Sequence, residues 1–155
     1  MVEETWKQVG SMSPEDAPPI AEEFSKQQLF LRTYLLAAGG DELNQDEREI
    51  LFYVGLVVWK ITTKGNKKIR KISPAVIEEA EDKNWKMINH LSKERNDLDF
   101  IKAAKSIVES CNQKNVLKYV VEALKKHNPE QGNLRDQSIG MMFIYLKTVI
   151  DCLDQ

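Results

Sequence analysis

The chain has 155 residues, of which 42% are hydrophobic and 30% are charged, so it can bury a core of its own and is too apolar to be disordered throughout. Its net charge of −2 gives it no general attraction to nucleic acids or other acidic partners. Seven glycines and five prolines are few, which favours long helices over a turn-rich β protein.

The N-terminal part of the chain predicts one long helix. Residues 1–12 show little pattern, and we expect them to be loosely ordered. A helix is predicted at residues 19–38, where Gly39 and Gly40 end it. Its apolar positions form one broad helical face: Ile20, Phe24, Leu29, Phe30, Leu31, Tyr34, Leu35 and Leu36. This face predicts packing against the rest of the chain.

The centre of the chain is a run of ten uncharged residues, from Ile50 to Trp59. Asn44 offers a helix N-cap before this run, and Glu47 stands three residues later, where a capping box places its carboxylate. Residues 44–64 therefore predict a buried helix, about 30 Å long at roughly 1.5 Å per residue. Its uncharged part is too short for a membrane span, which needs roughly 20 apolar residues.

Four further helices are predicted after the central one. They cover residues 74–92, 98–110, 113–126 and 134–153, as judged from apolar periodicity and helix-ending residues. Asn84 interrupts the apolar stripe of the first of these helices, and the last contains a second strongly apolar run. Gly55 and Gly140 lie inside the two apolar helices, which either cross closely at these glycines or carry them independently.

These elements together predict an all-α fold, in which a bundle of five to six helices surrounds the two apolar ones in a single domain. We find no secretory signal at the N-terminus and no run of transmembrane length, so we expect a cytoplasmic protein with no membrane partner. Cys111 and Cys152 are expected to be free, buried thiols, although their spacing leaves a bridge between them open.

The most polarised feature is the connector at residues 60–71, which contains six basic residues and no acidic one. Its cations can clamp the phosphates of a nucleic acid or a nucleotide, because such contacts need only charge and reach. The candidate binding residues are Lys64, Lys67, Lys68, Arg70 and Lys71. No aromatic residue stands among them to stack on bases, so a solvated loop is the alternative interpretation.

Acidic residues on the predicted helix at 74–92 offer a more distant function. Glu78, Glu79 and Asp82 lie on adjacent turns, and carboxylates from packed helices can hold Mg²⁺, so a magnesium-dependent nucleotide hydrolase is an alternative. A charged face is also what solvent exposure alone produces. The chain has two distant histidines and no phosphate-binding glycine loop, so we assign no catalytic residue, metal ligand or cofactor.

Protein association is the remaining hypothesis. A chain with so much apolar helical surface can leave one face for a partner helix or for a second copy of itself. The residues of the type found at such faces are Tyr34, Trp59, Trp85, Met141 and Met142, unless all five belong to the core. By elimination, the sequence predicts a non-enzymatic protein-interaction or regulatory module, with a homodimer as one form of it.

Overall fold

Helices account for the secondary structure of the chain wherever it is described. The computed structural model describes residues 17–63, 69–94, 107–109, 113–126 and 136–154. Within these ranges the elements are α2 (Ala17–Gln27), α3 (Leu29–Ala37), the 3-10 turn η1 (Gly40–Glu42), α4 (Gln45–Thr63), α5 (Pro74–Glu94), α7 (Lys114–Lys126) and α8 (Asp136–Leu153). The described part contains no strand, and the all-α prediction is confirmed.

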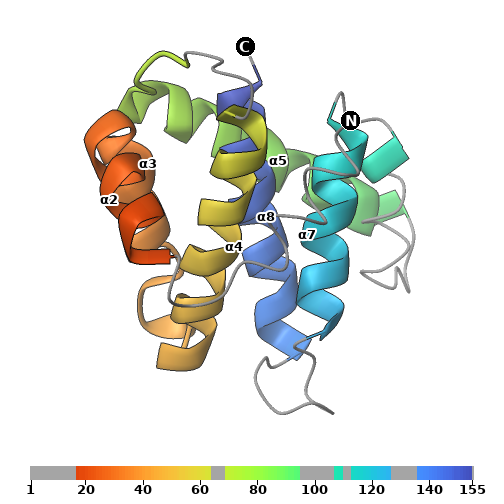
Figure 1. The fold of residues 1–155 in the computed structure, drawn as a ribbon. Coiled ribbons are helices and arrows are strands. Elements are labelled where there is room, and N and C mark those ends of the chain that lie inside the picture. Colours follow the sequence, from red (N-terminus) through yellow and green to blue (C-terminus); the bar gives the residue numbers. More distant parts are fainter. Residues whose placement is uncertain (1–16, 64–68, 95–106, 110–112, 127–135, 155) are drawn as a thin grey trace.

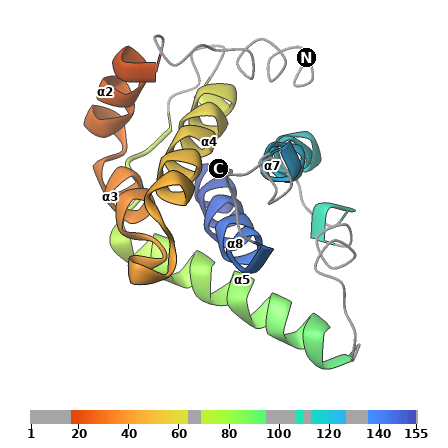
Figure 2. The same cartoon turned by 90° about the horizontal axis from the view of Figure 1, so that it is seen from below.

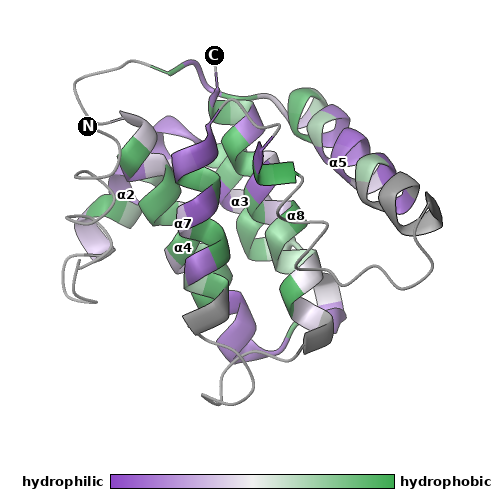
Figure 3. Cartoon of the chain, turned by 90° about the vertical axis from the view of Figure 1, so that its right-hand side faces the viewer, coloured by the Kyte–Doolittle hydropathy of each residue, from purple (hydrophilic) through white to green (hydrophobic). Residues whose placement is uncertain are grey.

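The two apolar helices lie at the centre of the bundle. Figure 1 shows α4 and α8 side by side, with α2 and α3 to one side of α4 and α7 to the other. Seen from below in Figure 2, α5 runs beneath α8. Every residue of α8 from 142 to 150 is buried, and its ribbon is largely green in Figure 3, where α5 alternates between purple and green. The prediction of two central helices is confirmed.

The start of α4 has the predicted capping box. The backbone N–H of Glu47 donates to Oδ1 of Asn44 at 2.9 Å. In return, the backbone N–H of Asn44 donates to a carboxylate oxygen of Glu47 at 2.9 Å. These two bonds satisfy N–H groups that would otherwise lack partners at the helix start. The helix therefore begins where the local sequence places it.

The prediction of a single helix at residues 19–38 is wrong. This part of the chain forms two helices, α2 and α3, which are separated at Gln28. Gln28 has a non-helical backbone with φ −133° and ψ 58°. The helix also begins two residues earlier than predicted, with Pro18 and Pro19 in its first turn, where proline is tolerated. The break turns α3 into a separate short helix against α4.

Gly55 makes a close approach, but its neighbour is not Gly140. The three atoms nearest to a β-carbon built on Gly55 would all belong to Leu35 of α3. Of the two alternatives, the contact at Gly55 favours the one in which the two central helices carry their glycines independently. The missing side chain there lets α3 lie close to the backbone of α4.

The later helices follow the predictions closely. α5 and α7 begin within one residue of their predicted starts, and α8 ends at Leu153 as predicted. Of the helix predicted at 98–110, residues 107–109 are helical and the others lie outside the described residues, as do residues 1–12. Cys152 is free and buried, so it forms no bridge to Cys111, which is outside the described residues.

Candidate functional site

The predicted basic connector is described only at its C-terminal end. Lys64, Lys67 and Lys68 lie outside the described residues, whereas Arg70 and Lys71 are present and exposed. Gln28 holds the backbone on both sides of Lys71. Its side-chain Nε2 donates to the Arg70 carbonyl at 2.9 Å, and its Oε1 accepts from the Ile72 N–H at 3.0 Å. The entry to α5 is thus fixed, with two cations on its surface.

The acidic residues of α5 face solvent around an open hollow. Glu78, Glu79 and Asp82 are exposed, and the hollow of about 760 Å³ beside them also contacts Tyr34 of α3. Glu79 pairs with Lys83 at 3.4 Å, one turn away on the same exposed face. Among the described residues, no three carboxylate, imidazole or thiol groups are placed to hold a metal ion together. The geometry here is that of a solvated helix face.

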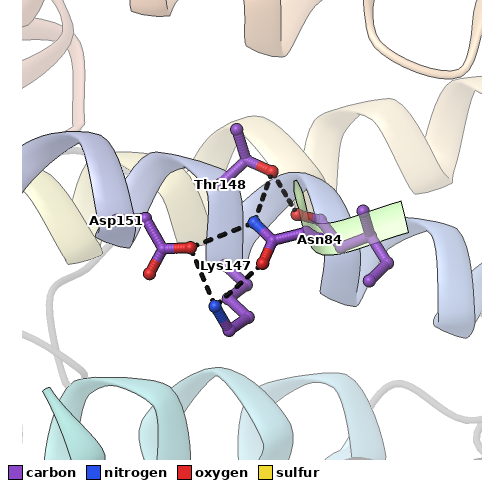
Figure 4. Close-up of polar contacts among 5 residues, drawn as sticks. Asn84, Lys147, Thr148 and Asp151 are labelled. Atoms are coloured by element: carbon purple, nitrogen blue, oxygen red, sulfur yellow. Dashed lines mark hydrogen bonds and ion pairs between the residues drawn. The ribbon is translucent and has the colours of Figure 1, made fainter. Parts of the chain in front are cut away.

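A buried polar cluster joins α5 to α8 (Figure 4). The amide nitrogen of Asn84 donates to Thr148 Oγ1 at 3.1 Å and to Asp151 Oδ2 at 3.0 Å. Lys147 Nζ donates to Asn84 Oδ1 and to Asp151 Oδ2, both at 2.8 Å. Asn84 is 2% exposed and Lys147 is 8% exposed. Because each group has a partner within the cluster, these residues form a structural tie between two helices.

The aromatic and methionine residues predicted as interface candidates lie in the core or pack against it. Trp59 and Met142 are buried, and Tyr34, Trp85 and Met141 pack against the buried cluster. The ring of Tyr145 contacts those of Tyr34 and Trp85, with centroids 6.1 and 6.2 Å away. Burial raises the pKa of the Tyr34 phenol, and the nearby Glu81 carboxylate raises it further. Trp59 and Met142 are therefore not available to a partner, whereas Tyr34, Trp85 and Met141 keep part of their surface exposed.

The exposed apolar surface lies instead on α3. Four large hydrophobic side chains of the described part are exposed, and three of them are on this nine-residue helix: Leu29 at 44%, Phe30 at 39% and Leu36 at 44%. The exposed positions of α3 are Leu29, Phe30, Thr33, Leu36 and Ala37, which we call the α3 face. None of them is charged.

Even the one polar residue of the α3 face is satisfied internally. The Thr33 hydroxyl donates to the Leu29 carbonyl at 2.9 Å, one turn back in the same helix. This bond occupies the hydroxyl hydrogen and leaves the methyl group of Thr33 as its apolar contribution to the surface. Other exposed helix surfaces of the chain carry charges, as at Glu22 and Lys26 of α2. The five residues of the α3 face carry no charge, and the partly exposed Arg32 is the charged residue of this helix.

An apolar groove adjoins the α3 face. It lies between α2, α3 and α4 and has a volume of about 480 Å³. Its apolar walls are Pro18, Ala21, Leu36, Phe52, Tyr53 and Leu56. Gln45, Arg48 and Glu49 add polar groups at the start of α4, and Arg48 Nη1 donates to the Leu36 carbonyl at 3.0 Å. Since Leu36 belongs to both, the α3 face and the groove form one continuous surface.

Comparison with known protein families, with curated proteins and with solved structures finds no match for this chain. A functional assignment must therefore be argued from the surface itself. Sequence reasoning missed the α3 face, because it treated Leu29, Phe30 and Leu36 as the margin of one buried face. The available signal was that α3 is apolar on more than one side.

Proposed function

We propose that this protein is a non-enzymatic helical interaction module, which binds a protein partner through the α3 face and the adjoining groove. The exposed apolar side chains of the α3 face carry the proposal, because such side chains gathered on one element are typical of protein-binding surfaces. A groove lined by apolar walls with a few polar groups at one end suits the apolar side of a helix. No described helix has the length and hydropathy that a membrane crossing requires.

A photo-crosslinking amino acid at position 36 tests this function directly. Leu36 and Val76 are both apolar and are 44% and 45% exposed, so Val76 on α5 is a matched control position. We expect a defined protein adduct from position 36 in cells, absent from position 76 and lost when Phe30→Glu is added. Absence of an adduct from position 36, or equal adducts from both positions, would overturn the proposal.

A second candidate function is the binding of a phosphate-bearing ligand by the basic connector. We place this function in the cytoplasm, because a free thiol such as that of Cys152 suits a reducing environment. It is favoured by the exposure of Arg70 and Lys71 beside a backbone that Gln28 holds in place. The test is fluorescence anisotropy of a short labelled nucleic acid at low and moderate salt. We expect salt-sensitive binding that weakens in Arg70→Ala/Lys71→Ala and persists in Lys26→Ala/Lys83→Ala. Binding unchanged in the first variant would exclude these two cations.

A further inference from the structure

The apolar groove lies next to the point where the described chain begins. Pro18 and Ala21 form its wall on α2, and α2 starts at Ala17. Residues 1–16, which we call the N-terminal segment, directly precede Ala17 and lie outside the described residues. The N-terminal segment is therefore joined to the chain beside a wall of the groove. By contrast, residues 64–68 follow Thr63, at the opposite end of α4 from the groove residue Gln45.

The N-terminal segment is long enough to cover the groove. The lining residues of α4 run from Gln45 to Leu56, which is about 16 Å at roughly 1.5 Å per residue. Trp6 stands eleven positions before Ala17, and a stretch of this length spans up to roughly 36 Å when it is extended. Trp6 can therefore reach every part of the groove.

We propose that the N-terminal segment occupies the groove of its own chain and inserts Trp6 between the apolar walls. Trp6 is the one aromatic residue of this segment. Its ring suits the groove, because Phe52 and Tyr53 line it and are both partly exposed, and aromatic rings pack favourably against one another. The regulatory consequence rests on the proposed function: a partner helix must displace the N-terminal segment before it enters the groove.

The charge of the N-terminal segment favours the same location. The segment has four acidic residues and one basic residue, so it is acidic overall. Arg48 is the cation of the groove lining. Its Nη1 donates to the Leu36 carbonyl, and its remaining N–H groups form no ion pair with the described residues. Glu49 beside it accepts a hydrogen bond from the Gln45 amide at 3.0 Å. Arg48 is thus placed to pair with a carboxylate of the segment.

The covalent connection makes the docking effective without a high intrinsic affinity. A short flexible linker gives the N-terminal segment a local concentration in the millimolar range at the groove. A partner in solution at a lower concentration competes only if its own affinity is correspondingly higher. The weak local pattern of residues 1–12 agrees with this arrangement, because such segments become ordered when they are tied to the body of the protein.

A photo-crosslinking phenylalanine derivative at position 6 of the full chain tests the location of the segment. We expect an adduct that peptide mass spectrometry maps to Leu36, Phe52 or Tyr53. In a mixture of ¹⁵N-labelled and unlabelled protein, the two linked peptides are expected to carry the same label, because the contact lies within one chain. No adduct, an adduct outside the groove lining, or linked peptides of mixed label would overturn the inference.

Trypsin cleavage after Lys7, the one basic residue of the N-terminal segment, measures how much of the segment is docked. We expect slower cleavage in the parent than in a free peptide of residues 1–16. Leu36→Glu is expected to speed cleavage about tenfold, the factor that corresponds to one lost apolar contact. Val76→Glu is the matched control, since Val76 and Leu36 are 45% and 44% exposed, and it should be cleaved at the parent's rate. Parent cleavage as fast as that of the peptide, or equal rates in the two variants, would contradict the docking.

The inference and the proposed function can fail separately. In cells, adding Trp6→Ser is expected to raise the yield of the protein adduct from position 36, because the groove is then uncovered, and an unchanged yield would overturn the regulatory role. A partner adduct from position 36 without a groove adduct from position 6 overturns the inference and leaves the proposed function standing. A groove adduct from position 6 without a partner adduct from position 36 overturns the proposed function and leaves the docking of the segment standing.

Discussion

Leu35 occupies the space that a side chain at position 55 would need. A β-carbon built on Gly55 would lie 2.5 Å from Cδ1 of Leu35, and Leu35 is itself 1% exposed. The buried side of α3 is thus seated directly on the backbone of α4. This seating determines which side of α3 is covered and leaves Leu29, Phe30 and Leu36 on the outside.

Gly55→Ala is therefore expected to destabilise the protein despite the better helix propensity of alanine. Alanine gains about 1 kcal/mol in a helix interior, whereas overpacking a filled core costs about 1–3 kcal/mol. In a Leu35→Ala background the obstruction is gone, and the same change should raise stability by about 1 kcal/mol. Urea unfolding of the four proteins gives this double-mutant cycle. An equal effect of Gly55→Ala in both backgrounds would contradict the contact.

Gln28→Leu should destabilise the protein although leucine is apolar and similar in size. Gln28 is 1% exposed, and the substitution leaves the Arg70 carbonyl and the Ile72 N–H without their partner. A buried polar group left unpaired costs about 1–3 kcal/mol. Hydrogen exchange at the Ile72 amide should also become faster. The control is Gln27→Leu, because Gln27 is exposed. If Gln27→Leu lowers stability as much as Gln28→Leu does, the effect comes from the helix in general and not from the two hydrogen bonds of Gln28.

Asn84→Asp is expected to make stability depend on pH in the acid range. The new carboxylate would stand about 3 Å from Asp151 Oδ2, at the place of the present amide. Lys147 Nζ, which contacts both positions at 2.8 Å, would lower its pKa. Because this ammonium is already paired with Asp151, we expect the like charge and the burial to prevail and to raise the pKa of the carboxylate pair in the folded state. The folded protein then binds more protons than the unfolded chain, and stability falls as pH rises above about 4. We expect a larger loss at pH 8 than at pH 5.

Asn84→Ala is the matched control for this experiment, because it removes the same hydrogen bonds without adding an acid. Its loss of stability should be about the same at pH 5 and pH 8. Urea unfolding at both values separates the two variants. If Asn84→Asp shows no more pH dependence than Asn84→Ala, the two carboxylates do not interact.

Alkaline pH should destabilise the folded chain through buried acids that are neutral at pH 7. Burial raises the pKa of the Cys152 thiol from 9.0 to about 12, and it raises the pKa of Tyr34, Tyr119 and Tyr145 as well. Above about pH 9 the unfolded thiol loses its proton first, so the folded state binds more protons and stability falls. The contribution of the Cys152 thiol to the free energy of unfolding is fully present below pH 9, and it is lost as the pH rises toward 12.

Cys152→Ala isolates the thiol from the tyrosines. Between pH 8 and pH 10 the loss of stability should be smaller in this variant by about 1 kcal/mol, because one group with a raised pKa has been removed. Urea unfolding at intervals of one pH unit measures the difference. Parallel curves for parent and variant would show that the thiol ionises equally easily in both states.

Most of the helices could be predicted from the sequence because their signals are local. The capping box at Asn44 and Glu47 and the uncharged run after it identify α4 without any knowledge of its neighbours. The break at Gln28 has no such signal, since the partners of its amide, Arg70 and Ile72, lie more than forty residues along the chain. Asn84 was visible as an interruption of a stripe, but its partners on α8 were not.

The candidate docking surface could not be predicted for a related reason. Periodicity shows that α3 is apolar on more than one side, and it cannot show which side a neighbouring helix covers. That choice depends on Gly55 and Leu35, which lie on different helices. The Lys64–Lys68 part of the predicted phosphate site lies outside the described residues and stays a prediction.

The tie between Asn84 and α8 also fixes the axial position of α5. An amphipathic helix can slide along an apolar neighbour at little cost when only hydrocarbon surfaces meet. Here, a slip of one turn, about 5.4 Å, would withdraw Asn84 from Lys147, Thr148 and Asp151 and leave a buried ammonium without one of its acceptors. One polar position in the middle of α5 thus selects a single register for its whole length.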